Sequence, residues 1–115
     1  MYFESDLDET TNITDGSTHF SAPFHLIEFY GFYVHFEATA IPQGSIYTIQ
    51  VSGRVDKPSL DIHWSDKYTD SFLSITKPTI VEDDILMKWV RYKVVCGLGS
   101  NIENFYGVIG AKGQR

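Results

Sequence analysis

Four histidines, one cysteine and a short acidic run are the side chains of this chain whose types could support chemistry. A zinc site needs three or four ligands that converge at bonding distance. No histidine lies at tight ligand spacing with another, and there is no second cysteine to complete such a set. The sequence therefore predicts no zinc site. The histidines are His19, His25, His35 and His63.

Cys96 could act as a nucleophile only if a histidine approached it and lowered its pKa. It follows Val90, Tyr92 and Val94 at a spacing of two residues, which places all four side chains on one face of a strand. That register predicts a small buried apolar residue rather than a reactive thiol.

The run "VEDD" from Val81 to Asp84 gathers three carboxylates, and carboxylate oxygens are ligands that calcium prefers. Its spacing matches no calcium-binding loop, so a solvated acidic loop is the favoured interpretation. The run "CGLGSN" lacks the lysine and the following helix of a phosphate-binding loop. We therefore expect no catalytic residues, no metal, no cofactor and no enzymatic activity.

Several aromatic side chains are candidates for a binding surface, because Tyr and Trp are enriched where proteins meet. The same residues could build a sugar-stacking platform or pack into the core. Arg91 and Lys93 alternate with apolar residues and are expected on the outward face of their strand, where they could pair with acids of the same or a neighbouring subunit. The predicted interface residues are Tyr33, Tyr47, Trp64, Tyr68, Arg91 and Lys93, with Trp89 as a further aromatic of the possible platform.

Composition narrows the class of protein. With 115 residues the chain predicts one domain, and its formal net charge of −6 argues against a nucleic-acid binder, which normally carries a basic face. No apolar run is long enough to cross a bilayer, and "MYFESDLDETTNITDG" does not resemble a secretory signal. We expect neither nucleic acid nor membrane among the partners.

Alternation with a period of two predicts strands in two main regions. In "FYVHFEATA", Phe32, Val34 and Phe36 share one face, "IPQG" interrupts the pattern, and "SIYTIQVSG" resumes it. Two alternating strands joined by a short Pro/Gly segment predict a hairpin. A second hairpin is predicted from "WVRYKVVC", the turn "GLGSN" and "FYGVIGAKG". Gly107 and Gly110 suggest a bulge or a close approach of another backbone.

The remaining segments are less regular. The stretch 54–84 predicts loop with short strands near 62–64 and 72–75, and "PFHLIEFYG" fits a short helical turn or a strand. Residues 1–16 are acidic and polar, and predict a flexible N-terminal arm ahead of a domain over 17–115. Overall, the pattern predicts an all-β, antiparallel β-sandwich or jelly roll of about seven or eight strands.

Two stretches also resemble a known family. "GFYVHFEATAIPQGSIYTIQVSGRVD" followed by "DIHW", and "KWVRYKVVCGLGSNIENFYGVIGAKG", are similar to patterns in small structural proteins of tailed phages. The usual "S-x-D-G-x-x-W" turn departs from the pattern here, because "SGRVDKPSLDIHW" contains extra residues. The same order of motifs also resembles discoidin-like, galactose-binding sandwiches.

The phage resemblance implies a capsid decoration protein or a head or tail accessory protein of β-sandwich or jelly-roll fold, found in the virion and assembled in the host cytoplasm. Its partners would be copies of itself and other virion proteins, and deleting the arm would weaken assembly without unfolding the domain. The alternative is a carbohydrate- or surface-binding module that uses Trp64, Tyr68 and nearby acids.

Overall fold

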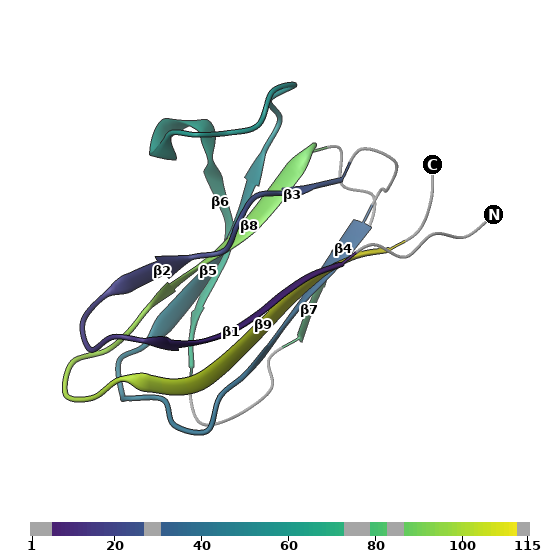
Figure 1. Ribbon diagram of the computed structural model, residues 1–115. Helices are drawn as coiled ribbons and strands as arrows, with labels where there is room; N and C mark the ends of the chain where they lie inside the picture. The colour runs from purple at the N-terminus through teal and green to yellow at the C-terminus, as the bar shows by residue number, and fades with distance from the viewer. Residues whose placement is uncertain (1–5, 27–30, 73–78, 83–86, 113–115) are drawn as a thin grey trace.

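The computed structural model describes residues 6–26, 31–72, 79–82 and 87–112, and within these ranges it contains strands and one 3-10 turn but no α-helix. Two antiparallel sheets form two layers that face each other (Figure 1). In the described ranges no helix is long and apolar enough to cross a membrane. The elements are β1 (Asp6–Ile13), β2 (Thr18–Phe20), β3 (Phe24–His25), β4 (Gly31–Glu37), β5 (Ile46–Ser52), η1 (Asp61–His63), β6 (Ser65–Ser71), β7 (Thr79–Glu82), β8 (Trp89–Val95) and β9 (Ile102–Lys112).

The order of the strands is that of a jelly roll. The first sheet runs β1-β9-β4-β7, and the second runs β2-β8-β5-β6, with β3 also paired to β8. Because β2 and β3 share one partner, they act as a single interrupted strand. The first strand then pairs with the last, and each further pair joins strands that lie nearer the middle of the chain, which is the wrapping of a jelly roll. These pairs are β1–β9, β2–β8, β4–β7 and β5–β6. The prediction of an antiparallel β-sandwich or jelly roll is confirmed.

Both predicted hairpins were wrong. β4 pairs with β7 and β9, whereas β5 pairs with β6 and β8, so the segment between β4 and β5 crosses from one sheet to the other. The segment between β8 and β9 crosses in the same way. Alternation reports which face of a strand is buried but not which strand lies beside it, and a Pro/Gly turn serves a crossing as well as a hairpin.

The two crossings pack against each other. Gly44 adopts φ +88°, which favours glycine. The hydroxyl of Ser45 accepts a 2.9 Å hydrogen bond from the backbone N–H of Gly97. A Cβ atom at Gly97 would collide with the Gln43 carbonyl, so glycine is needed where the crossings meet.

The N-terminal segment is part of the sandwich, contrary to the predicted arm over residues 1–16. Residues 6–13 form β1, which pairs with β9 from Asp6↔Gly110 to Ile13↔Ile102. Ile13 is in the core, and Leu7 packs against it. The polar composition was misleading because β1 is an edge strand, whose exposed side chains Asp8 and Thr10 alternate with inward ones. Residues 1–5 lie outside the described residues.

The core between the sheets is built from the alternating faces that the sequence predicted. Phe36 of β4 lies at the centre, with ring centroids of Tyr47, Phe72, Tyr92 and Phe105 within 5.0–5.7 Å. Such contacts stabilise a core beyond the burial of area alone. The predicted burial of the inward side of β8 is confirmed, since Val90, Tyr92, Val94 and Cys96 are all buried.

The glycines of β9 make room for side chains rather than for another backbone. A Cβ atom at Gly107 would collide with the phenol of Tyr92, and one at Gly110 would collide with the ring of Tyr33. The predicted close approach of another backbone was therefore wrong at these glycines, because the groups that approach are tyrosine rings.

The irregular middle of the chain differs in detail from the sequence prediction. A 3-10 turn replaces the strand expected near 62–64, and the strand follows it as β6. The strand expected over 72–75 lies mostly outside the described residues, as do two of the acids of the "VEDD" run; its first two residues belong to β7. In "PFHLIEFYG", Phe24 and His25 form strand β3, and residues 27–30 lie outside the described residues.

Candidate functional site

The outer face of the second sheet holds a cluster around Arg91 that we call the Arg91 clamp: Arg91, Phe20, Trp64, Gln50 and Asp61. The guanidinium carbon of Arg91 lies 4.3 Å from the ring centroid of Phe20 and 4.5 Å from that of Trp64. Its Nε donates a 2.7 Å hydrogen bond to Gln50 Oε1, and Nη2 lies 3.4 Å from a carboxylate oxygen of Asp61. The guanidinium thus joins β2, β5, β8 and the segment before β6.

The contributions to this clamp are unequal. Asp61 is 90% exposed, so its ion pair with Arg91 contributes little free energy. Cation–π contacts with two rings and a hydrogen bond from a charged donor contribute more. Burial lowers the pKa of Arg91, and Asp61 acts in the opposite direction. The amide of Gln50 is itself held by a 2.8 Å bond to Asp66, so the clamp is an intramolecular support.

The clamp holds one end of a projecting loop, which we define as residues 53–64, between β5 and β6 (Figure 1, top of the view). At the other end, the indole N–H of Trp89 donates a 3.1 Å hydrogen bond to the carbonyl of Arg54. Within the loop, the backbone N–H groups of Ser59 and Leu60 both donate to Nδ1 of His63 at 3.2 Å. The loop is therefore secured at both ends and braced internally.

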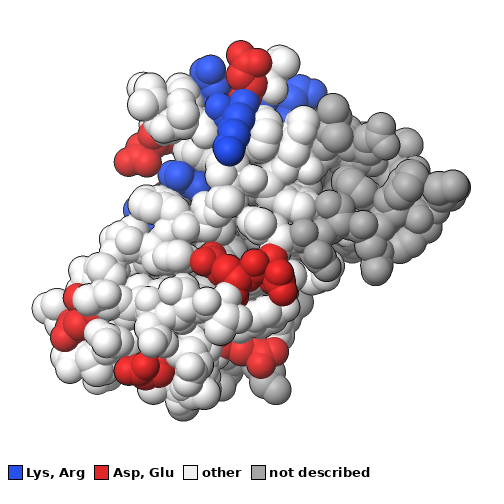
Figure 2. Space-filling view, in the orientation of Figure 1, with Lys and Arg blue, Asp and Glu red and all other residues white. Residues whose placement is uncertain are grey.

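Large apolar side chains of this loop face solvent. Val55 is 79%, Leu60 59% and Ile62 85% exposed. Arg54, Asp56, Lys57 and Asp61 accompany them, so charges of both signs surround the apolar residues. In Figure 2 blue and red side chains mix at the end of the molecule that carries the loop, whereas only red ones are visible at the lower end. An apolar centre surrounded by a polar rim is typical of protein–protein interfaces.

The predicted interface residues do not form one surface. Arg91 and Trp64 lie in the clamp, where Trp64 is buried. Tyr47 is in the core, and Tyr33 covers Gly110 on the first sheet. Tyr68 is partly exposed on β6, with its hydroxyl bonded to Asp70 at 3.1 Å. Lys93 lies next to Phe20 in the register of β2 and β8, on the outward face as expected.

Sequence reasoning missed the clamp partners Phe20, Gln50 and Asp61 and the apolar residues of the projecting loop. Isolated Val, Leu and Ile within a charged, Pro-containing segment were the available signal for the loop. Nothing local in the sequence indicated the position of Phe20 beside Arg91, because only the pairing of β2 with β8 brings them together.

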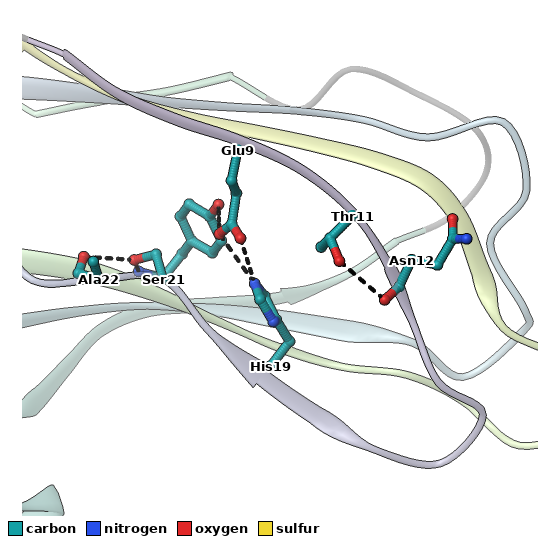
Figure 3. A network of polar contacts seen from close by, with 7 residues as sticks. Glu9, Thr11, Asn12, His19, Ser21 and Ala22 are labelled. Carbon is teal, nitrogen blue, oxygen red and sulfur yellow. Dashed lines mark hydrogen bonds and ion pairs between the residues drawn. The ribbon is translucent and has the colours of Figure 1, made fainter.

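A second polar cluster joins the two sheets and is drawn in Figure 3. Nε2 of His19, on β2, lies 2.9 and 3.0 Å from the two carboxylate oxygens of Glu9, on β1. The hydroxyl of Tyr92, on β8, donates to the same carboxylate. Burial raises the pKa of Tyr92, and the hydrogen bond to Glu9 raises it further. We call these three residues the Glu9 network.

Two tyrosines should make the fold sensitive to alkali. Burial raises the pKa of Tyr47 to about 12, and the pKa of Tyr92 is raised as well. Phenols of the unfolded chain ionise near pH 10, so stability is fully present below about pH 10 and falls above it. We expect the free energy of unfolding, measured by urea titration, to fall above pH 10 by up to about 1.4 kcal/mol per pH unit for each buried phenol.

The matched variants are Tyr92→Phe and Tyr33→Phe, the second at a ring that covers Gly110 on the first sheet. Each urea midpoint is compared with that of the same variant at pH 8. The decline should be shallower in Tyr92→Phe and unchanged in Tyr33→Phe. Identical declines in the wild type and in both variants would show that ionisation of Tyr92 does not cause the loss of stability above pH 10.

The candidate site is a surface formed by the Arg91 clamp and the projecting loop, in the part of the chain that the structure describes. There, no three His, Cys, Asp or Glu side chains are grouped as metal ligands would be, and no pocket is found. The chain matches no family model, no curated protein and no solved structure.

Proposed function

We propose that this chain is a non-enzymatic structural protein of a virus particle, a capsid decoration protein or a head or tail accessory protein that acts through protein–protein interfaces. The observation that carries the proposal is the projecting loop, a braced segment that presents Val55, Leu60 and Ile62 to solvent. Its partners are copies of the same chain and other virion proteins.

Exposed apolar side chains contribute free energy to association when a partner removes them from water. Association also costs the ordering of any flexible segment at the interface. The Arg91 clamp and the Trp89–Arg54 hydrogen bond hold the loop before any partner binds. A loop braced in this way keeps that ordering cost low, which supports a binding role for it.

The virus-particle part of the proposal is supported by analogy. Jelly rolls occur in viral capsid subunits and in lectins, so the fold alone favours neither. The two stretches that resemble tailed-phage proteins favour the capsid branch. They cover β4, β5, β8 and β9, which pair directly as β4–β9 and β5–β8.

The burial of Trp64 favours an interface role over the carbohydrate-binding alternative. A sugar-stacking residue needs an open ring face, but Trp64 is buried and one side of its ring faces the guanidinium of Arg91. Tyr68 is partly exposed, yet Trp64 does not join it in an open platform.

Sedimentation velocity of the wild type, Ile62→Asp and Leu98→Asp tests the proposal. Ile62 and Leu98 are each 85% exposed, but Leu98 belongs to the segment between β8 and β9. That segment lies at the other end of the molecule from the projecting loop (Figure 1). We expect the wild type to form an oligomer that Ile62→Asp shifts toward monomer and Leu98→Asp does not. Thermal unfolding should be alike in all three. Equal association of the three proteins would remove the loop from the proposal.

A further inference from the structure

We propose that β6 is a pairing edge for a second copy of this chain, and that the two β6 strands run antiparallel about a two-fold axis at Thr69. The inference rests on the proposed function, because it names the partner of the projecting loop and the orientation of that partner. β6 begins directly after the loop (Figure 1). A copy that pairs along β6 therefore lies beside the loop.

β6 is the outermost strand of the second sheet. In the part of the chain that the structure describes, its strand neighbour is β5, and no strand pairs with its other edge. Six of its seven residues are exposed, whereas the edge strand β1 alternates half-buried with exposed residues from Leu7 to Asn12. An edge strand that is exposed on both faces can accept a strand from another chain if its side chains allow the pairing.

The backbone groups of Thr69 and Ser71 point to this free edge. The N–H of Phe72 donates a 3.0 Å hydrogen bond to the carbonyl of Ser45, so the backbone of Phe72 faces β5. The pairing of β6 with β5 is regular over residues 68–71. Because successive residues of a strand direct their backbone groups to opposite sides, Ser71 and Thr69 face outward. A second strand can therefore exchange hydrogen bonds with Thr69.

The charges of β6 leave one two-fold register. In a two-fold antiparallel pair, the axis passes through a residue that lies opposite its own copy. An axis at Asp66, Lys67 or Asp70 places a charge opposite itself, which is unfavourable. An axis at Tyr68 places Asp66 opposite Asp70 of the second copy, which is unfavourable for the same reason. An axis at either terminal serine pairs little more than the end of the strand, so Thr69 remains.

The register about Thr69 also brings together side chains that complement each other. It places Tyr68 opposite Asp70 of the second copy, at the closer of the two Cα spacings of an antiparallel pair. Within one chain the hydroxyl of Tyr68 donates to Asp70 at 3.1 Å, so the two side chains already lie on one face. The ring of Tyr68 is held beside Tyr47, with centroids 6.1 Å apart. Each phenol can therefore donate to the carboxylate of the other copy with little ordering cost.

The paired segment is short, so it acts together with the projecting loop. A two-stranded ribbon by itself is marginally stable in water. The loop contributes exposed apolar side chains, Leu60 and Ile62 among them, and β6 fixes the orientation of the two copies. Loss of the loop contact in Ile62→Asp should therefore weaken the pairing of β6 as well.

Disulfide cross-linking of Thr69→Cys under mild oxidation tests this register. Residues on the axis have Cα atoms about 5.5 Å apart, which a disulfide can bridge. Tyr68→Cys is the matched control at the neighbouring exposed position, because Cα atoms of residue 68 would be about 8 Å apart and out of reach. The native Cys96 is buried, so it does not compete.

We expect Thr69→Cys to form two-chain products about ten-fold faster than Tyr68→Cys. If the wild type is an oligomer that Ile62→Asp dissociates, but Thr69→Cys cross-links no faster than Tyr68→Cys, the register is overturned while the proposed function stands. A wild type that sediments as a single chain would overturn both.

A second pair of variants tests the backbone hydrogen bonds. Thr69→Pro removes the N–H that points to the free edge, where a proline is tolerated within the sheet. Thr69→Val also loses the hydroxyl but keeps the N–H. In sedimentation velocity, Thr69→Pro should shift toward single chains and Thr69→Val should not. Equal association of these two variants would contradict the pairing of β6.

Discussion

Deletion of residues 1–13 is expected to abolish cooperative folding at 25 °C. The deletion removes β1, uncovers the edge of β9 and takes Ile13 and Leu7 from the core. Loss of one buried isoleucine side chain alone costs about 2–5 kcal/mol, against a total stability of about 5–15 kcal/mol for a typical domain. Circular dichroism and a urea titration of the truncated protein measure the effect.

A synthetic peptide of residues 1–16, added in trans, is the control for this experiment. If β1 acts as a strand, the peptide should restore a cooperative transition to the truncated protein. A flexible arm would behave differently, because its removal would leave the urea midpoint unchanged. A wild-type midpoint in the truncated protein would contradict the role of β1 described above.

Substitution of Arg91 by alanine should lower the free energy of unfolding by about 2–4 kcal/mol. The change removes two cation–π contacts and the charged hydrogen bond to Gln50. Arg91→Lys should recover only part of the loss, because an ammonium cannot reproduce the planar fork of a guanidinium. Urea titrations of the wild type, Arg91→Ala and Arg91→Lys measure the free energies of unfolding.

Lys93→Ala is the matched control, since Lys93 lies on the same outward face of β8. Its effect should stay within about 0.5 kcal/mol, as for most surface substitutions. Equal losses for Arg91→Ala and Lys93→Ala would mean that the contacts of the clamp contribute little. A loss of association without a loss of stability in Arg91→Ala would instead place Arg91 in an interface between subunits.

The sequence was informative wherever burial alternates along a strand. The alternation of Phe32, Val34 and Phe36, and of Val90, Tyr92 and Val94, predicted the inward faces of β4 and β8 correctly. Period two is a local property that each strand carries by itself. The fold class could therefore be predicted without any knowledge of pairing.

Pairing itself depends on contacts between distant segments. β4 and β5 are neighbours in the chain but belong to different sheets, while β1 pairs with β9 from the opposite end of the described chain. Composition also hid β1, because its acidic side chains include Glu9, whose inward position is stabilised by His19 and Tyr92. A polar residue that is satisfied by partners far along the chain cannot be recognised as inward from local sequence.

In the candidate site, too, the sequence indicated residue types, whereas the contacts depend on segments that are distant in the chain. Arg91 and Trp64 were named from their residue types, but their contact depends on the path of the projecting loop back over the second sheet. The exposure of Ile62 likewise follows from the 3-10 turn that replaces the expected strand. Residue type indicated which side chains were suited to recognition, and tertiary structure decided which of them face solvent.

Native mass spectrometry of the intact chain tests the central claim most directly. A structural subunit that associates through its projecting loop should give a mass that is a whole multiple of the single chain, and Ile62→Asp should shift the distribution to single chains. A wild-type protein that remains a single chain at every concentration tested would contradict the account.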